Sequence, residues 1–543
     1  MTFETRLSPE LITTYTEAGY WQDTLLTDRL DEHAAATPDA VAFVDSRGSI
    51  TFGELKRLSD RAALGLLELG IGPGDVISFQ LPNWIEWIIA HLAAIRIGTV
   101  SNPLIPIYRE REVGFMAGLA ESKLIIVPRE FRDFDYPAMV ERVRADVPTL
   151  EHVLVVDGQG EGTQSWEDFL ATPWEERRDP AELAALRPDP NEVMLLIFTS
   201  GTTGEPKGVM HTHNSIYSAV RPLPDRLEIN QDTVFHMAST LGHLTGFLYG
   251  VWLPLHNGRP CVLQDVWNGK TFAQLVEEHR ISYTSAATPF LHDLLGVLEL
   301  EDPDLSSMRL FCCMGAPIPR TLVRQAKERL PGMTVLGGWG QTENGLVTLG
   351  IPGDPEEKIT ETDGYPWPGM RIRVVGFDGT VLPPDTEGAL QVEGPAVTVG
   401  YAHRPQWTED SFHDGWFDTG DLAIIDQDGY VKIAGRSKDI IIRGGENIPV
   451  AYVENALYEH PDIQALAVVG IPDPRLQERA ALVCVMREGA PELDLPGVQQ
   501  FLHSKGVAKQ YWPERVEVVG ELPRTSSGKI QKFKIRQTLG VQP

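Results

Sequence analysis

The sequence contains few cysteines, and they are not arranged as in a metal site or a disulfide scaffold. Only four occur among its 543 residues, and none lies in CxxC or Cys/His ligand spacing. A chain of this length can bury enough apolar surface to be stable without disulfides or metals. We therefore expect reduced cysteines in a cytoplasmic protein, with the adjacent Cys312 and Cys313 acting as small buried hydrophobic residues.

Basic charge and long apolar runs are also scarce. Lysine and arginine number 47 against 76 acidic residues, a formal net charge of −29, which disfavours nucleic acid and anionic membranes as partners. The longest apolar segment, residues 84–97, is interrupted by Glu86, His91 and Arg96 and is shorter than the roughly 20 residues of a membrane-spanning helix. We expect no integral membrane segment, and no secretory signal, because no basic segment followed by an apolar run opens the chain.

Helix and strand patterns alternate along most of the chain. Leu55, Leu58 and Ala62 keep helical spacing, and residues 76–79 then form an extended apolar run. Similar short runs at residues 123–127, 152–156 and 193–198 are typical of buried strands with helices between them. This pattern predicts an α/β fold.

The pattern changes after about Arg371, where shorter strands and turns predict a small β-rich subdomain. Further on, Pro449 can begin a helix with Val450, Val453 and Leu457 on one face. Residues 465–471, 480–486 and 516–519 then have the composition of strands. We expect a compact α+β domain of about 100 residues at the C-terminal end.

One stretch has the chemistry of a phosphate-binding loop. Directly after an apolar strand, glycines that allow close backbone approach are mixed with hydroxyl donors and a single cation. The residues are Thr199, Ser200, Gly201, Thr202, Thr203, Gly204 and Lys207. This is not a Walker A loop, because Pro206 stands where GxxxxGK[ST] requires the second glycine.

Further motifs follow in a fixed order: Trp339–Glu343 (WGQTE), Asp418–Asp421 (DTGD), Gly435-Arg436, and PRTSSGKI from Pro523. Together with the phosphate loop they resemble the adenylate-forming superfamily, and in particular acyl-CoA synthetases of the cyclohexanecarboxylate and medium-chain fatty acid type. The resemblance covers nearly the whole chain. It implies a large N-terminal domain, residues 1–437, of two α/β sheet subdomains and a small β-rich subdomain. A mobile α+β domain, residues 438–543, would carry the catalytic lysine.

The resemblance also implies roles for the motif residues toward ATP. Glu343 would hold Mg²⁺ on the nucleotide phosphates, Trp339 would stack on adenine, and Asp421 would accept hydrogen bonds from both ribose hydroxyls with Arg436 assisting. Thr199, Ser200, Thr203 and Lys207 would hold the leaving pyrophosphate. The remaining implied nucleotide contacts are Gly201, Thr202, Gly204, Gly315, Ala316, Pro317, Gly338, Gly340, Gln341 and Thr342.

Lys529 would be the catalytic lysine, bridging the substrate carboxylate and the α-phosphate, two anions that repel one another. Lys438 matches the family's hinge, about which the C-terminal domain turns after adenylation. Gly444 and Gly445 would then line the path of CoA. The implied reaction joins a carboxylic acid to CoA at the expense of ATP through an acyl-adenylate.

The acid is less well specified by the sequence. By resemblance, Ser239, His243, Gly337 and Gly338 border the acyl pocket, and the glycines argue for room. Residues 15–21 and 102–109 resemble the corresponding segments of cyclohexanecarboxylate:CoA ligases and dihydroxybenzoate-activating enzymes, and this resemblance implies a cyclic, aromatic or medium-chain acid. Loading of a carrier protein in place of CoA is the first alternative, and nucleotide binding without catalysis is the second. The oligomeric state stays open, with a homodimer as one arrangement.

Overall fold

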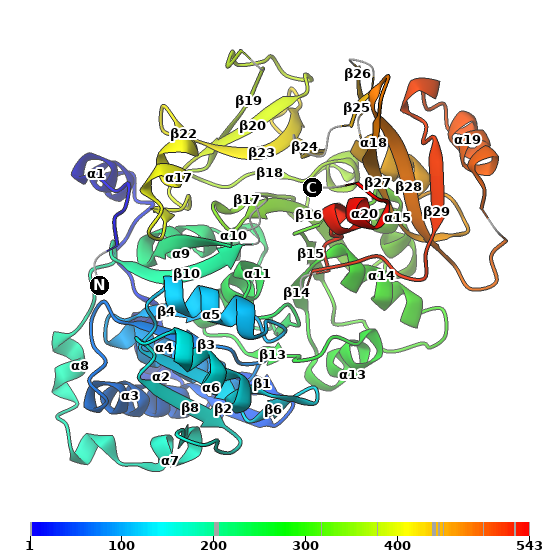
Figure 1. Cartoon of the computed structure of the whole chain (residues 1–543). Coiled ribbons are helices and arrows are strands. Elements are labelled where there is room, and N and C mark those ends of the chain that lie inside the picture. The colour runs from blue at the N-terminus through cyan, green and yellow to red at the C-terminus, as the bar shows by residue number, and fades with distance from the viewer. Residues whose placement is uncertain are drawn as a thin grey trace.

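The structure, a computed structural model, describes residues 3–199, 206–316, 318–376, 378–436, 441–443, 446–448, 450–491, 493–525 and 528–541. The fold is α/β, with a large N-terminal part built on two mixed sheets, a small β-rich sheet, and a smaller C-terminal α+β part (Figure 1). The fold class predicted from the sequence is therefore confirmed.

The first large sheet has nine strands in the order β18-β17-β16-β15-β14-β12-β13-β1-β2, and its centre, from β16 to β1, is parallel. The parallel strands are short and almost wholly buried, as expected where helices cover both faces. The nine strands are β1 (Val41–Asp45), β2 (Gly48–Thr51), β12 (Phe235–Met237), β13 (Cys261–Leu263), β14 (Tyr283–Ala286), β15 (Leu310–Cys313), β16 (Thr334–Gln341), β17 (Gly345–Leu349) and β18 (Tyr365–Pro366).

The second large sheet has eight strands in the order β21-β11-β10-β4-β3-β5-β8-β9. Its strands are β3 (Val76–Phe79), β4 (Val100–Pro103), β5 (Leu124–Pro128), β8 (His152–Val156), β9 (Gln164–Ser165), β10 (Val193–Thr199), β11 (Lys207–Thr212) and β21 (Gly400–Tyr401). The predicted apolar runs at residues 123–127, 152–156 and 193–198 coincide with β5, β8 and β10. The antiparallel pair β10–β11 forms a hairpin next to the parallel strand β4.

Two smaller sheets follow, and a short ribbon pairs β6 (Glu130–Phe131) with β7 (Phe134–Asp135). The β-rich sheet contains β19 (Arg371–Val375), β20 (Gly388–Glu393), β22 (Phe412–His413), β23 (Trp416–Ile425) and β24 (Val431–Arg436). The C-terminal sheet contains β25 (Ile441–Arg443), β26 (Glu446–Ile448), β27 (Ile463–Asp473), β28 (Gln477–Met486) and β29 (Arg515–Val518). In Figure 1 the C-terminal elements, orange to red, are grouped on one side of the larger part.

Helices connect the strands and cover the sheets. They are α1 (Pro9–Glu17), α2 (Leu26–Ala36), α3 (Phe52–Glu68), α4 (Ile85–Arg96), α5 (Glu110–Leu119), α6 (Tyr136–Asp146), α7 (Trp166–Ala171), α8 (Ala181–Ala185), α9 (His213–Val220), α10 (Leu223–Arg226), α11 (Leu244–Phe247), α12 (Leu253–Asn257), α13 (Gly269–His279), α14 (Thr288–Val297), α15 (Arg320–Arg329), α16 (Glu356–Glu361), α17 (Pro405–Asp410), α18 (Val450–Leu457), α19 (Leu495–Ser504) and α20 (Lys532–Thr538). Short helical turns occur at η1 (Trp174–Glu176), η2 (Leu248–Trp252) and η4 (Lys509–Tyr511).

The buried hydrophobic residues form separate clusters, and each cluster belongs to only one of the two parts of the chain. The two buried clusters of the C-terminal part draw only on residues from 441 onward, among them Val453, Leu457, Leu466 and Leu482. The helix face predicted from Val450, Val453 and Leu457 is thus the one buried in α18. Cys312 and Cys313 are buried in β15, and burial raises the pKa of each thiol to about 12, so both behave as small apolar residues.

The apolar segment at residues 84–97 forms the buried helix α4. No helix in the described ranges combines the length and the apolar character needed to cross a bilayer.

Candidate active site

Three hairpins, each from a different sheet, carry the predicted nucleotide residues. In the β10–β11 hairpin, Thr199 and Lys207 are register partners at the two ends of the phosphate loop. The β16–β17 hairpin carries the motif that includes Gln341 at its turn. In the β-rich sheet, β23 and β24 place Asp421 directly opposite Arg436.

Several predicted residues lie outside the described part of the chain, and their roles stay predictions. They are Ser200, Gly201, Thr202, Thr203 and Gly204 of the phosphate loop, Pro317, the hinge residue Lys438, and Gly444 and Gly445 of the CoA path. Gly315 and Ala316 are described. Gly315 has a φ of +85°, a left-handed conformation that favours glycine, and it lines the cavity that also contains Lys529.

Asp421 is the centre of a hydrogen-bond network that joins two sheets. Its Oδ2 accepts from Trp339 Nε1 at 2.8 Å and from Gln341 Nε2 at 3.0 Å, and its Oδ1 lies 2.8 Å from Arg436 Nε. The residue is 4% exposed, and burial raises the pKa of its carboxyl group, an effect opposed first by Arg436. The network holds the indole of Trp339, on β16, against Asp421 of the β-rich sheet, and stacking of that ring on adenine remains a prediction.

The turn between β16 and β17 depends on glycine. A Cβ at Gly340 would lie 1.9 Å from the carbonyl oxygen of Gly345, a distance no side chain tolerates. Asn344, which is fully buried, closes the turn by accepting from the backbone N–H of Gln341 at 2.7 Å. Thr342 and Glu343 are therefore presented at the tip of a tight, rigid turn.

His211 connects this turn to the strand that follows the phosphate loop. Its Nε2 lies 2.7 Å from the carbonyl oxygen of Thr342, so Nε2 carries the hydrogen and Nδ1 accepts from Ser215 Oγ at 3.2 Å. Burial lowers the pKa of His211 to about 4, which keeps the ring neutral and preserves this pattern. Sequence reasoning missed this contact, which joins residues 131 positions apart.

Replacing His211 with leucine is expected to loosen the turn. The carbonyl of Thr342 would lose its donor, so we expect the KM for ATP to rise by roughly 10-fold and the free energy of unfolding to fall by about 1–3 kcal/mol. Steady-state kinetics with varied ATP and denaturant unfolding measure the two effects. His213→Leu is the matched control, because His213 is also buried but its Nδ1 has no partner in the described ranges. Equal KM values for the two variants would contradict the role of His211.

Lys207 projects between two aromatic rings. Its Nζ lies 4.9 Å from the ring centre of Tyr401 and 5.2 Å from that of Trp407, a cation–π arrangement that orients a mobile ammonium group. The hydroxyl of Tyr401 donates to Glu343 Oε1 at 3.2 Å. Tyr401 thus contacts both the predicted pyrophosphate-binding lysine and the predicted Mg²⁺ ligand.

Lys529 lies on a cavity together with residues of the N-terminal part. The cavity is lined by His243, Leu244, Thr245, Leu248, Tyr249, Met314, Gly315, Gly340, Gln341, Thr342, Gly345, Leu346 and Lys529. Burial and the Arg436 guanidinium lower the pKa of the Lys529 ammonium group, and Asp421 and Glu343 oppose the shift. A half-buried cation therefore lies within electrostatic reach of the nucleotide motifs, although the nearest of their residues, Arg436, is 93 positions away in sequence.

His243, on the same cavity, is a neutral hydrogen-bond donor. Its Nδ1 accepts from the backbone N–H of Thr245 at 3.3 Å, so the hydrogen of the neutral ring resides on Nε2. Burial, and next the nearby Lys529, lower the pKa of His243 to about 4. A donor N–H and a cation thus belong to one cavity, an arrangement suited to a carboxylate.

The other predicted acyl-pocket residues do not line this cavity. A Cβ at Gly337 would lie 2.9 Å from the Thr362 carbonyl oxygen, and one at Gly338 would lie 2.7 Å from Leu349 Cδ1. These glycines therefore permit close packing, and the expectation that they provide room is corrected. The Ser239 carbonyl accepts from Asn83 Nδ2 at 3.0 Å, a long-range contact that holds its loop.

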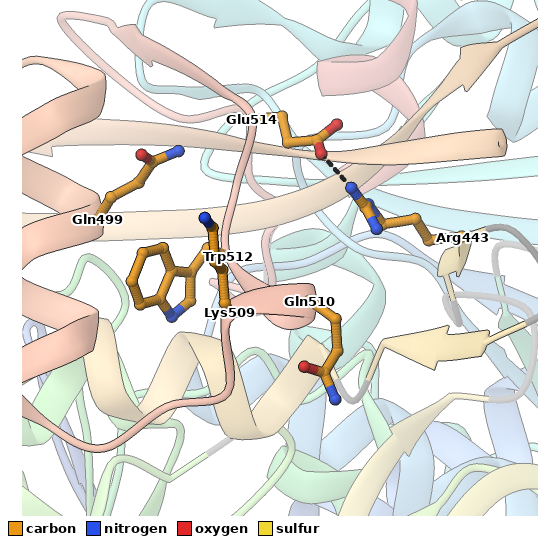
Figure 2. Close-up of a pocket in the computed structure, with 6 residues that line it drawn as sticks. All are labelled: Arg443, Gln499, Lys509, Gln510, Trp512 and Glu514. Atoms are coloured by element: carbon orange, nitrogen blue, oxygen red, sulfur yellow. Dashed lines mark hydrogen bonds and ion pairs between the residues drawn. The ribbon is translucent and has the colours of Figure 1, made fainter. Parts of the chain in front are cut away.

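A second, larger cavity of about 330 Å³ lies in the C-terminal part. It is lined by Arg443, Gln499, Lys509, Gln510, Trp512 and Glu514, and Figure 2 shows the ion pair between Arg443 and Glu514 at one side of it. None of the residues predicted for ATP, the acid or CoA belongs to it. The cavity that contains Lys529 is therefore the candidate active site.

Comparison with known proteins gives matches along nearly the entire chain. A medium-chain fatty-acid–CoA ligase of Escherichia coli (strain K12) is 38% identical over 527 residues, which cover 97% of this chain and 92% of the relative. A salicylyl-CoA synthase / salicylate adenylyltransferase of Streptomyces sp is 33% identical, with 97% and 95% covered. The solved structure of ATP-bound MatB from Rhodopseudomonas palustris superposes with a TM-score of 0.83 at 28% identity, covering 95% of this chain and 99% of that one.

The α/β fold and these relatives define an acid–thiol ligase that works through an adenylate. The pattern described as AMP-binding enzyme matches residues 30–402, and the pattern of the AMP-binding enzyme C-terminal domain matches residues 452–529. The chain belongs to the AMP-binding enzyme family. The superfamily predicted from the sequence motifs is thereby confirmed.

Proposed function

We propose that this ligase converts a cyclic, aromatic or medium-chain carboxylic acid, ATP and CoA into acyl-CoA, AMP and pyrophosphate. The observation that carries the proposal is that Lys529, His243 and the Gly340–Thr342 turn line a single cavity. The substrate range draws support from the relatives, whose names specify medium-chain fatty acids and salicylate.

In the first step the acid's carboxylate attacks the α-phosphorus of ATP and pyrophosphate departs. We assign Lys529 to the space between the two anions, where its charge offsets their repulsion. His243 Nε2–H donates to a carboxylate oxygen and orients it. Thr199 and Lys207 hold the leaving pyrophosphate together with the loop between them, while Asp421 and Arg436 bind the ribose.

The residues present fit a Mg²⁺ ion carried by the nucleotide. No group of three His, Cys, Asp or Glu side chains able to hold a metal occurs in the described ranges, so a metal held by protein alone finds no site there. Mg²⁺ commonly binds through one or two carboxylates with water and substrate phosphates, and Glu343 offers one such carboxylate at the tip of the β16–β17 turn. Bound there, Mg²⁺ would neutralise charge on the phosphates.

The second step needs a different arrangement of the C-terminal part. We propose a domain boundary between residues 437 and 438, with rotation about Lys438 that withdraws Lys529 and brings Gly444 and Gly445 toward the acyl-adenylate. The separate hydrophobic clusters of the C-terminal part support its movement as a unit. The CoA thiol then attacks the mixed anhydride and AMP leaves.

The test is a panel of acids assayed for pyrophosphate release and for thioester formation, with and without CoA. We expect pyrophosphate with cyclic or medium-chain acids, and a CoA thioester when CoA is present. Pyrophosphate without any CoA thioester would favour the loading of a carrier protein, the first alternative. Nucleotide binding without pyrophosphate release for every acid would contradict the proposal and favour a non-catalytic role.

A further inference from the structure

The cavity that contains Lys529 is also lined by a tyrosine, Tyr249, whose hydroxyl has no hydrogen-bond partner among the described residues. Tyr249 is 2% exposed and lines the cavity with His243 and Lys529. Its hydroxyl makes no hydrogen bond to any residue that the structure describes. A polar group in such a position costs free energy unless something in the cavity pairs with it.

Tyr249 differs in this respect from the four other tyrosines whose exposed fraction is 3% or less. Each of the others pairs its hydroxyl within the protein: Tyr136 with the Pro106 carbonyl oxygen at 2.8 Å, Tyr217 with His256 Nδ1 at 3.1 Å, Tyr283 with Ser285 Oγ at 2.8 Å, and Tyr401 with Glu343 at 3.2 Å. The Tyr249 hydroxyl is not among the fully enclosed side-chain atoms without a partner, so its oxygen opens onto the cavity, where a bound molecule can pair with it. The missing partner is expected to come from a ligand.

The backbone around Tyr249 is held rigidly. It lies in η2, a π-helical turn inserted between α11 and α12, and such turns occur often at functional sites. The turn packs so closely on its neighbours that a Cβ at Gly250 would lie 2.6 Å from Met237 Cγ and 3.0 Å from Leu241 Cδ2. The backbone that carries the phenol therefore has little room to shift.

The surroundings also fix the protonation state of the phenol. Burial, and next the nearby Cys312, raise the pKa of Tyr249 well above the value of a free tyrosine. Tyr283, which interacts electrostatically with Tyr249, already pairs its hydroxyl with Ser285 on β14. The hydroxyl of Tyr249 thus stays protonated across the working pH range and can donate a hydrogen bond.

We propose that the Tyr249 O–H donates a hydrogen bond to an oxygen substituent that the acid carries in addition to its carboxylate. The preferred substrates are therefore hydroxy-, alkoxy- or oxo-substituted acids, and Tyr249 discriminates against their unsubstituted counterparts. This inference rests on the proposed function, because Lys529 and His243 hold the carboxylate while Tyr249 reads the rest of the molecule.

The test compares matched pairs of acids in the full-length enzyme: benzoate with its three monohydroxy isomers, cyclohexanecarboxylate with its hydroxy derivatives, and octanoate with 8-hydroxyoctanoate. We expect the wild-type kcat/KM for adenylation to favour one hydroxylated member over its parent. Tyr249→Phe should lower that preference by about 10-fold, the free-energy contribution of one such hydrogen bond, because it removes the hydroxyl that pairs with the substituent.

Tyr136→Phe is the matched control, because it also removes one buried hydroxyl, here bonded to Pro106 in a different part of the core. It should leave the preference unchanged, and thermal melting of both variants checks that they are folded. A preference that changes less than about 2-fold in Tyr249→Phe, with wild type active, overturns this inference alone. Absence of pyrophosphate release by the wild type with every acid overturns the proposed function, and this inference with it.

Discussion

Lys529→Ala is expected to lower the rate of acyl-adenylate formation by about 10²–10³-fold, the usual loss when one group that stabilises developing charge is removed. The same variant should convert chemically prepared acyl-adenylate and CoA into thioester at close to the wild-type rate. The reason is that Lys529 acts, in the proposed mechanism, between a carboxylate and the α-phosphate, and the free carboxylate exists only in the first step. Pyrophosphate release and thioester formation measure the two half-reactions separately.

The loop that carries Lys529 is held by contacts that do not use its side chain. The backbone N–H of Lys529 donates to Thr525 Oγ1 at 3.0 Å, and its carbonyl accepts from the Thr525 N–H at 2.7 Å. A Cβ at Gly528 would lie 3.2 Å from Pro289 Cγ, so the loop lies against the start of α14 in the N-terminal part. Removal of the ammonium group should therefore leave the loop in place.

Lys534→Ala is the control for this prediction, because it removes an exposed lysine from the neighbouring helix α20. It should not change either half-reaction. If Lys529→Ala retained adenylation within about 3-fold of wild type, or lost both half-reactions equally, the assignment of Lys529 to the first step would be wrong.

The elements that the sequence predicted well are those defined by local patterns. The apolar run at residues 193–198 became β10, and the helix face of Val450, Val453 and Leu457 became the buried face of α18. Periodicity reports burial within one element, and glycine with proline reports turns, so such features can be found without knowing the neighbours.

The contacts that shape the site were not predictable in the same way. His211 bonds to Thr342 and Asn83 to Ser239, pairs separated by 131 and 156 positions, and nothing in either segment alone indicates its partner. The π-helical turn at Tyr249 adds one residue to a helical pattern, which periodicity cannot resolve over so short a segment. The expectation that glycines make room for the acid depended on distant neighbours in the same way. Gly337 instead allows the backbone at Thr362 to approach closely.

The hydrogen bonds that Asp421 already accepts limit how it can bind the ribose. By resemblance its carboxylate would bind both ribose hydroxyls, but in this structure it already accepts from Trp339, Gln341 and Arg436. A carboxylate offers about four lone-pair sites. Binding of both hydroxyls therefore requires one of these donors to withdraw, and Arg436, with a side chain 42% exposed, has the most freedom to move.

Asp421→Asn is accordingly expected to raise the KM for ATP by roughly 10- to 100-fold, the worth of one hydrogen bond to a charged group. An amide in this place must direct its NH₂ group either toward Arg436 or toward the Trp339 and Gln341 donors, so at least one contact becomes repulsive. Asp418→Asn on the same strand is the control, because Asp418 is exposed and its side chain accepts only from the Gly420 N–H of its own turn in the described ranges. A KM for ATP that rises equally in both variants would mean that the change at Asp421 acts through the strand and not through the nucleotide.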